Sequence, residues 1–284
     1  MANGGSFESL FAIGFLSYSA VSVVAVAAVA LIGYILGLLL SKRKPNEDPK
    51  GTNMKITAFG GTHVGGRANN EDAFLIQDDG FVVADGMGGM ARGEEASATL
   101  IEAFRGRSPS EPAWFKDSLA AAHQRMQEMV AEDPVREGFA TTVTAVRRSS
   151  PTELQVHWAG DSPLFRLRAG VLEQVTEDHS LAVYLWKTGQ IEKNAIAKSP
   201  VRNVLYKNVG AAKAPEWDEL SIEVEAGDRY LICSDGLVDY TDLAKVATIL
   251  GGAGAPEERV SALIANALAD KTRDNATAIV IDIS

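Results

Sequence analysis

The first part of the chain is a long apolar stretch unlike anything after it. Residues 10–40 carry no charged side chain, and residues 19–40, SAVSVVAVAAVALIGYILGLLL, are long and apolar enough to cross a bilayer as a helix. No basic segment precedes the stretch, and it is too long for a usual signal peptide. We therefore expect an N-terminal segment, residues 1–44, with one transmembrane helix over about residues 19–40.

The basic cluster Lys42-Arg43-Lys44 directly follows this stretch. By the positive-inside rule, such a cluster keeps the C-terminal side of the helix in the cytoplasm. Residues 45–53 are mostly polar and contain two prolines, which is typical of a linker. We expect a single-pass protein of the cytoplasmic (inner) membrane whose main domain, residues 54–284, lies in the cytoplasm.

After residue 54 the pattern changes to short apolar runs separated by helical patterns. The β-like runs are 56–59, 73–76, 81–84, 141–147, 154–159, 164–167, 220–224, 230–233 and 276–283. Apolar residues recur at helical spacing within 93–104, 112–131 and 256–269. Strands that are often adjacent in sequence, placed before and after a helical pair, predict an α+β fold of sheets covered by helices.

Composition and charge narrow the possible functions. The chain of 284 residues is 46% hydrophobic and 23% charged, as in a globular protein. Its net charge of −10 argues against a nucleic-acid partner, which needs a basic face, whereas surplus carboxylates suit a divalent-cation site. The single cysteine, Cys233, excludes an intrachain disulfide, and its apolar run favours a buried, inert thiol.

Acidic residues recur where the predicted strands begin or end. Asp85 closes one apolar run and is followed by Gly86, and Asp235 repeats this arrangement downstream. An Asp-Gly pair alone is usually only a turn. Several acids at strand ends can nevertheless converge on one edge of the fold, and we expect them to form one site. In chain order these acids are Glu71, Asp72, Asp85, Asp161, Asp235 and Asp274.

The chemistry of these groups indicates a metal site. Carboxylates and a backbone carbonyl are hard ligands that suit magnesium or manganese, and the chain has neither a cysteine pair nor HExxH for zinc. Two such ions that share a carboxylate activate a water and hold an in-line displacement. Arg67, five residues before Asp72, can offer a guanidinium fork to phosphate oxygens. Together these residues point to phosphoester hydrolysis.

A series of motifs carries these residues in order between about residue 55 and residue 283. They are GGRANNEDA, VVADGMGGMARGEEAS, ATTVTAV, WAGDSPLFRLRAG, VTEDHSL, SPVRNVLYKNVG, LICSDGLVDY and TRDNATAIVI. The series resembles the metal-dependent Ser/Thr protein phosphatases, the PPM or type 2C protein phosphatase family, in a bacterial form. The resemblance implies a four-layer α/β/β/α sandwich of two antiparallel sheets flanked by helices, with two manganese or magnesium ions.

The resemblance also implies roles for the residues around the two ions. Asp85 matches the carboxylate that bridges both ions, and Gly86 matches the residue whose carbonyl binds one of them. Asp235 and Asp274 match the acids that complete the shell of the other ion. Asn275 is expected to support Asp274 through a hydrogen bond.

Further positions match the family around this pair of ions. Glu71 and Asp72 match an acidic pair that binds the cluster directly or through water. Arg67 matches the arginine that binds phosphate. Asp161 and Asp239 fall where the family often holds a looser third ion, but the neighbouring Pro163 replaces a common arginine and puts that ion in question. The usual Gly-Thr-Thr is Ala140-Thr141-Thr142 here, and we expect only local backbone adjustment.

The implied mechanism is a direct attack of the metal-bridging hydroxide on phosphorus, without a phospho-enzyme, while Arg67 and the ions stabilise the equatorial oxygens. Eukaryotic relatives carry a histidine where this chain has Met87, and a thioether cannot donate a proton to the leaving oxygen. A metal-bound water is the first candidate donor, and His63 is the second. For His179, a structural hydrogen bond is the favoured interpretation.

The segment 176–210 matches the family's flap, which lies beside the active site and varies with substrate. It carries several basic residues, which either attract phosphorylated segments or are ordinary solvated side chains. These basic residues are Lys187, Lys193, Lys198, Arg202 and Lys207.

The leading hypothesis is a membrane-anchored protein Ser/Thr phosphatase that acts on phosphorylated proteins and counters a cognate Ser/Thr kinase in bacterial signalling. One alternative is a non-catalytic phosphoprotein-binding or scaffold module on the same fold, which the intact ligand set disfavours. The other is an enzyme dedicated to one regulatory partner, in a secretion-system or anti-sigma pathway.

Overall fold

The computed structural model describes residues 54–88, 92–211 and 213–284. The transmembrane helix expected over residues 19–40 and the linker over 45–53 lie outside these residues, so both stay predictions. In the part of the chain that is described, no helix combines the length and the apolar character needed to cross a membrane.

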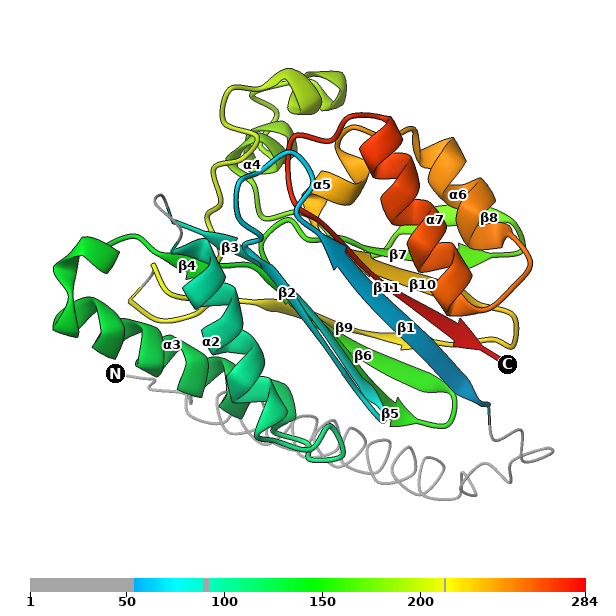
Figure 1. Cartoon of the computed structure of the whole chain (residues 1–284), viewed down its shortest axis with the longest axis horizontal. Helices are drawn as coiled ribbons and strands as arrows, with labels where there is room; N and C mark the ends of the chain where they lie inside the picture. Colours follow the sequence, from blue (N-terminus) through cyan, green and yellow to red (C-terminus); the bar gives the residue numbers. More distant parts are fainter. Residues whose placement is uncertain (1–53, 89–91, 212) are drawn as a thin grey trace, which may run out of the picture. The chain divides into compact units, whose positions relative to one another are not determined.

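Two antiparallel sheets form the centre of the fold (Figure 1). The five-stranded sheet has the order β1-β11-β10-β7-β8, with strands Ile56–His63, Ala276–Ile283, Arg229–Cys233, Leu164–Arg168 and Val171–Gln174. The six-stranded sheet has the order β2-β3-β5-β6-β9, with strands Asp72–Gln77, Gly80–Met87, Val143–Ser150, Glu153–Ala159 and Asp218–Glu223. The short β4 (Ala140–Thr141) pairs with the end of β3.

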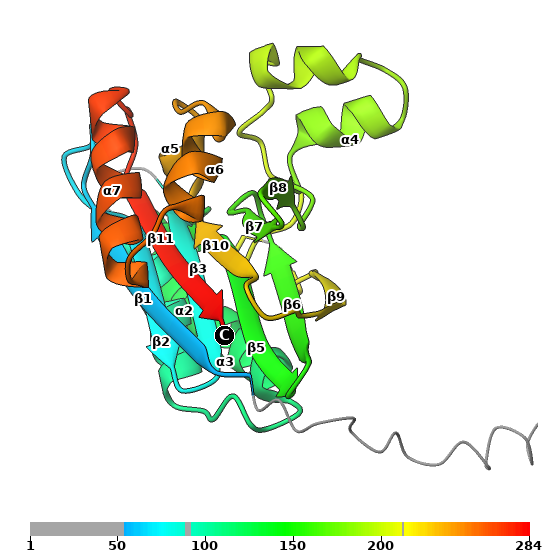
Figure 2. The same ribbon diagram turned by 90° about the vertical axis from the view of Figure 1, so that its right-hand side faces the viewer.

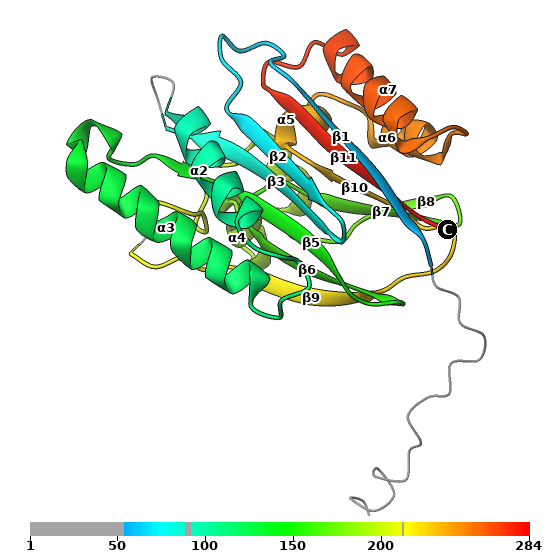
Figure 3. The same ribbon diagram turned by 60° about the horizontal axis from the view of Figure 1, so that its bottom comes forward.

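Helices cover the outer face of each sheet (Figure 3). The six-stranded sheet packs against α2 (Gly93–Arg105), which in turn contacts α3 (Trp114–Glu132). The five-stranded sheet packs against α6 (Leu243–Gly251) and α7 (Pro256–Ala269). The four-layer α/β/β/α sandwich implied by the family resemblance is therefore confirmed. The remaining helices among the described residues are the short α4 (Leu181–Lys187) and α5 (Asp235–Val238) and the 3-10 helices η1 (Pro134–Arg136) and η2 (Lys193–Lys198).

Alternation along β3 explains why this strand reads as one continuous apolar run. Successive side chains of a strand point to opposite faces. Val82 packs against the helices α2 and α3, whereas Val83 packs into the core between the two sheets. Both faces of the strand are buried, and a fully buried valine or leucine contributes about 1.5–3 kcal/mol. This burial fixes the register that places Asp85 at the strand end.

The predicted strands and the three predicted helices all form, but some elements were missed. Helix α4 has only seven residues, too few to show a helical period. Strand β8 is mostly exposed and therefore lacks an apolar run. Helix α6 begins at Leu243 and was also missed; its N-cap residue is Asp242, whose side chain accepts a hydrogen bond from the Ala244 N–H. Cys233 is buried and free, as expected.

Candidate active site

Asp85 is held rigidly at the end of β3. It lies directly opposite Asp72 in the pairing of β2 with β3. Its N–H donates to Thr142 Oγ1 at 3.0 Å, and its carbonyl accepts from the Thr142 N–H at 2.9 Å and from Thr141 Oγ1 at 3.0 Å. These bonds fix the backbone on both sides, so the carboxylate position is determined by the sheet. These hydrogen bonds are present although Ala140 replaces the glycine of the family's usual Gly-Thr-Thr.

Gly86 occupies a place where no side chain fits. A Cβ there would lie 2.0 Å from the Gly93 carbonyl oxygen and 2.7 Å from the Glu71 carbonyl oxygen. The Gly86 N–H donates to that same Glu71 oxygen at 3.1 Å. Glycine is therefore required for the close approach of three backbone segments at the site.

Asn275 joins the start of β11 to the loop that carries Arg67 and Glu71. Its side-chain amide donates to the carbonyls of Val64 and Asn69 at 2.8 and 2.9 Å, and its Oδ1 accepts from the Glu71 N–H at 2.8 Å. Its backbone N–H donates to Asp274 Oδ1 at 2.8 Å. The expected support of Asp274 is present, and the side chain has the additional task of fixing this loop.

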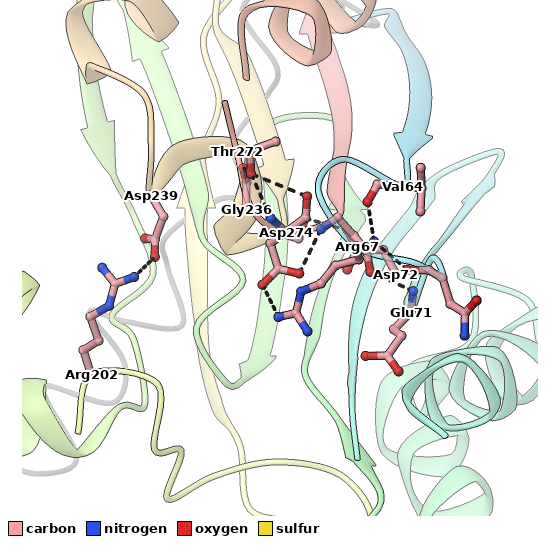
Figure 4. A network of polar contacts seen from close by, with 12 residues as sticks. Val64, Arg67, Glu71, Asp72, Arg202, Gly236, Asp239, Thr272 and Asp274 are labelled. Atoms are coloured by element: carbon pink, nitrogen blue, oxygen red, sulfur yellow. Dashed lines mark hydrogen bonds and ion pairs between the residues drawn. The ribbon is translucent and has the colours of Figure 1, made fainter. Parts of the chain in front are cut away.

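Arg67 and Asp274 form an ion pair in which Arg67 Nη2 lies 2.6 Å from Asp274 Oδ2 (Figure 4). The hydrogen bond to Asp274 is the main cause that raises the pKa of Arg67. The guanidinium remains about half exposed, at 52%. One carboxylate therefore orients the arginine while the rest of its fork faces solvent.

Asp72 lies beneath the site, buried between the two sheets. Its Oδ2 accepts a hydrogen bond from Ser234 Oγ at 2.7 Å, and Ser234 Oγ in turn accepts from the Thr277 N–H at 3.0 Å. Its Oδ1 is buried and has no hydrogen-bond partner among the described residues. Burial raises the pKa of Asp72 to about 6.

One cavity of about 340 Å³ collects most of the residues that the sequence singled out. It brings together the ends of β3 and β10, the loop before β11 and the loop before β2, although these segments are distant in the chain. Its lining comprises Arg67, Glu71, Asp85, Gly86, Met87, Gly88, Thr142, Asp161, Asn203, Leu205, Asp235 and Asp274. We call this space the catalytic cavity.

A second cavity of about 350 Å³ adjoins the first and shares Asp161, Asn203 and Asp235 with it. Asp239 lines only this second cavity. It pairs with Arg202 from the flap, with Arg202 Nη2 at 3.1 Å from Asp239 Oδ2, to one side of the Arg67 pair (Figure 4). The two acids expected at a third ion thus border the same space, but one of them already has a cationic partner.

The partly buried acids that line the cavities repel one another. Burial raises the pKa of Asp85 and of Asp235 well above the usual range, and neighbouring carboxylates raise both further. Burial also raises the pKa of Asp161 to about 7, with Asp178 the strongest repelling neighbour. A cation bound among these carboxylates would relieve their repulsion and so stabilise the folded protein.

The donor set fits hard divalent cations. Carboxylate oxygens from both sheets line the catalytic cavity, and the buried Asp72 Oδ1 is a further unused acceptor. Within the described ranges, no three Asp, Glu, His or Cys side chains already converge as ligands of one ion. Two of the acids are oriented by other partners: Asp274 accepts a hydrogen bond from Arg67, and Asp72 accepts one from Ser234.

Comparison with known proteins agrees with this site. The family model for protein phosphatase 2C matches residues 59–269. The chain belongs to the protein phosphatase 2C family. The family predicted from the sequence is thereby confirmed.

Similar proteins include bacterial Ser/Thr phosphatases. Serine/threonine protein phosphatase PstP of Mycobacterium tuberculosis is 34% identical over 224 residues, which cover 76% of this chain and 43% of that protein. The chain therefore matches less than half the length of this curated relative. The crystal structure of the M. tuberculosis phosphatase PstP/Ppp is similar with a TM-score of 0.75 at 31% identity, over 81% of this chain and 99% of that chain.

A second solved structure is the catalytic domain of PstP in complex with two manganese ions. It has a TM-score of 0.73 at 30% identity and covers 81% of this chain and 99% of that chain. The manganese ions belong to that protein. They match the hard-cation chemistry that the oxygen donors of the present PP2C domain favour.

The positions of Met87, His63 and His179 can be compared with their expected roles at this PP2C site. Met87 lines the catalytic cavity. His63 accepts a hydrogen bond at Nδ1 from the Gly65 N–H at 2.9 Å and is not part of the cavity lining. His179 is buried and accepts at Nδ1 from the Gly160 N–H at 3.1 Å, which confirms the structural hydrogen bond expected for it.

The basic residues of the flap are mostly paired. Lys187 Nζ lies 2.7 Å from Glu177 Oε1, Arg202 pairs with Asp239, and Lys207 pairs with Asp218. These contacts reduce the free positive charge that the flap could offer to a phosphorylated segment. The residues that sequence reasoning missed are neutral: Thr142, Ser234, Asn203 and Leu205. All four lie inside the quoted motifs, and Thr142 was also named in Ala140-Thr141-Thr142, but none of them was given a role at the site.

Proposed function

We propose that this PP2C domain is a metal-dependent protein Ser/Thr phosphatase that hydrolyses phosphoserine and phosphothreonine in proteins. The carrying observation is the catalytic cavity, in which the half-exposed guanidinium of Arg67 shares the lining with the carboxylates of Asp85 and Asp235. A phosphate monoester is an anion. The guanidinium and the cations held by the acids would both attract it.

Each side of the cavity has a task in this reaction. Divalent cations held by Asp85, Asp235 and Asp274 would supply Lewis acidity and a water of lowered pKa. Arg67, fixed by Asp274, donates hydrogen bonds to phosphoryl oxygens from the exposed part of its fork. Met87 and Leu205 add apolar walls that limit water around the phosphoryl group.

The proton for the leaving serine or threonine oxygen comes from water. No histidine is among the residues described as lining the catalytic cavity, and the Met87 thioether there has no proton to give. Of the donors considered from the sequence, a water in the cavity is therefore preferred to His63.

The test is a turnover assay of the full-length chain with p-nitrophenyl phosphate and a phosphothreonine peptide in the presence of manganese. We expect hydrolysis of both, its loss after thorough chelation, its return with added manganese and its loss in Asp85→Asn. Activity that survives chelation would contradict the metal-dependent mechanism. Stable phosphopeptide binding without turnover would instead support the non-catalytic alternative.

We further propose that the protein is anchored in the cytoplasmic membrane and counters a Ser/Thr kinase there. The support is the uncharged stretch 19–40, the basic cluster that follows it and the phosphatase site itself. An anchor raises the local concentration of the enzyme near membrane substrates. C-terminal fusions test the orientation. A fused fluorescent protein should fluoresce and a fused alkaline phosphatase should be inactive. The reverse pattern would refute the cytoplasmic placement.

A further inference from the structure

An exposed apolar surface lies on the flap next to the catalytic cavity. It consists of Tyr184, Val204 and Tyr206, which are 48%, 49% and 45% exposed, and we call it the tyrosine ledge. The rings of the two tyrosines meet edge to face, with centroids 6.1 Å apart. Tyr184 belongs to α4, which stands out from the end of the sheets (Figure 2), and Val204 and Tyr206 belong to the segment that pairs with residues 179–181.

Backbone pairing connects the ledge to the catalytic cavity. The Leu181 N–H donates to the Val204 carbonyl at 2.7 Å, and the Tyr206 N–H donates to the His179 carbonyl at 3.0 Å. Successive side chains of such an extended segment point to opposite faces. Leu205 lines the catalytic cavity, while its neighbours Val204 and Tyr206 form the ledge. One short segment therefore contributes to both surfaces.

Buried aromatic rings support the ledge from below. Tyr206 meets the edge of His179 at a centroid distance of 5.5 Å, and His179 stacks on Trp158 at 5.8 Å with an interplanar angle of 2°. Both supporting rings are buried, at 1% and 6% exposure. A rigid, exposed aromatic surface of this kind loses little conformational entropy when it binds a partner.

The chemistry of the ledge is apolar. The nearby ammonium group of Lys187 already pairs with Glu177, and Lys207 pairs with Asp218. Paired charges at a partly exposed surface add little to the recognition of a further charge. Aromatic faces and a valine instead favour an aliphatic or aromatic side chain.

We propose that the tyrosine ledge binds an apolar side chain of the phosphoprotein substrate close to its phosphorylated residue. The proposal rests on the phosphatase function proposed above, because the substrate's phosphoryl group would lie in the catalytic cavity. The segment 204–206 borders the cavity through Leu205, so a substrate chain that leaves the cavity over this edge would meet Val204 and Tyr206. The ledge is then a determinant of substrate specificity, separate from the chemistry.

Binding and turnover are measured separately on the full-length chain in detergent. The binding probes are two labelled peptides that carry a non-hydrolysable phosphonate analogue of phosphothreonine, one flanked by leucine and phenylalanine and the other by glycine and serine. Their Kd values are determined by fluorescence anisotropy with manganese present. We expect about tenfold tighter binding of the apolar peptide, the order expected for one well-buried apolar side chain.

The variant Tyr184→Ala/Tyr206→Ala should reduce this preference to less than about twofold, and Tyr184→Ala alone should reduce it in part. The matched control is Val171→Ala, an exposed apolar residue on β8 with 67% exposure, which should keep the full preference. Turnover of p-nitrophenyl phosphate should stay at the wild-type level in Tyr184→Ala, because Tyr184 does not line the catalytic cavity.

A wild-type protein without preference, or a double variant that keeps it, would overturn the proposal. Equal loss in Val171→Ala would also overturn it. If the double variant disturbs turnover through His179, the single variant Tyr184→Ala decides the question by its Kd ratio. A wild type that binds selectively but hydrolyses nothing would refute the phosphatase function and leave the ledge supported, so the two failures are distinguishable.

Discussion

Two Asp-Gly pairs deliver carboxylates to the catalytic cavity, one from each sheet. Asp85-Gly86 lies at the end of β3, and Asp235-Gly236 follows β10. Both pairs come after a buried apolar run, and both glycines are forced by backbone contact. A Cβ would lie 2.0 Å from the Gly93 oxygen at the first position and 2.1 Å from the Asn275 oxygen at the second.

The backbones at the two pairs differ. Asp85 stays within a strand, faces Asp72 across the ladder and is bonded on both sides to Thr142. Asp235 instead opens the four-residue helix α5, after which Asp239 pairs with Arg202 of the flap. The same dipeptide therefore gives one carboxylate that the sheet holds still and another whose neighbourhood is connected to the flap. Four predictions sharpen this contrast.

The largest effect is expected from Asp85→Asn and Asp235→Asn. Each should lower kcat with manganese by about 100-fold or more, because a neutral amide stabilises a cation poorly. Each should also raise the Tm of the protein in EDTA, since burial and repulsion raise the pKa of both acids and the amide removes that cost. Asp78→Asn, at an exposed position, is the control. A lower Tm in EDTA would contradict the electrostatic account.

Gly86→Ala and Gly236→Ala test whether both glycines are required by backbone contact. Each should lower the free energy of unfolding by about 1–3 kcal/mol and reduce activity, because a backbone segment has to move away from the new Cβ. Urea denaturation measures the change. Gly106→Ala is the matched control, since its nearest neighbour would be 3.8 Å away. Equal stability of all three variants would show that the close approaches are not rigid.

The acids should make stability depend on pH when metal is removed. The folded-state pKa values of Asp72 and Asp161 are raised to about 6 and about 7, so the folded protein keeps protons that the unfolded chain releases. The free energy of unfolding should therefore fall as pH rises from about 5 to about 7.5, with a Tm decrease of about 5 °C in EDTA. Manganese should reduce this decrease by replacing the protons. A Tm that rises over this window in EDTA would refute the pKa assignment.

The smallest effect is expected at the Asp235-Gly236 pair, whose helix leads to the ion pair of Asp239 with Arg202. In Arg202→Ala, the carboxylate of Asp239 loses its partner and becomes available to a cation, so the half-saturating manganese concentration should fall by about two- to fivefold. A manganese titration of phosphopeptide hydrolysis measures it. Arg166→Ala, which breaks a surface pair with Glu173, should leave the titration unchanged. A requirement for more manganese in Arg202→Ala would contradict competition between the arginine and the cation.

Much of the fold could be read from local patterns. The run before Asp85 is buried on both faces, so its strand was visible without its partners. The exposed strand β8 and the seven-residue α4 have too weak a period, so they were missed. The candidate ligand acids were recognisable by their place beside strand ends. The Asp72–Ser234 and Asp239–Arg202 contacts join residues far apart in sequence and left no local signal.

The sequence by itself determined most of the strands, the acids with their glycines and the family, because side-chain period and steric demand are local properties. Only the tertiary structure decided which acids share a cavity, which are paired and which are buried. The physical reason is that burial and charge pairing depend on the packing of two sheets against each other. The opposite faces of residues 204–206, one toward the cavity and one toward solvent, likewise exist only once the flap pairs with residues 179–181.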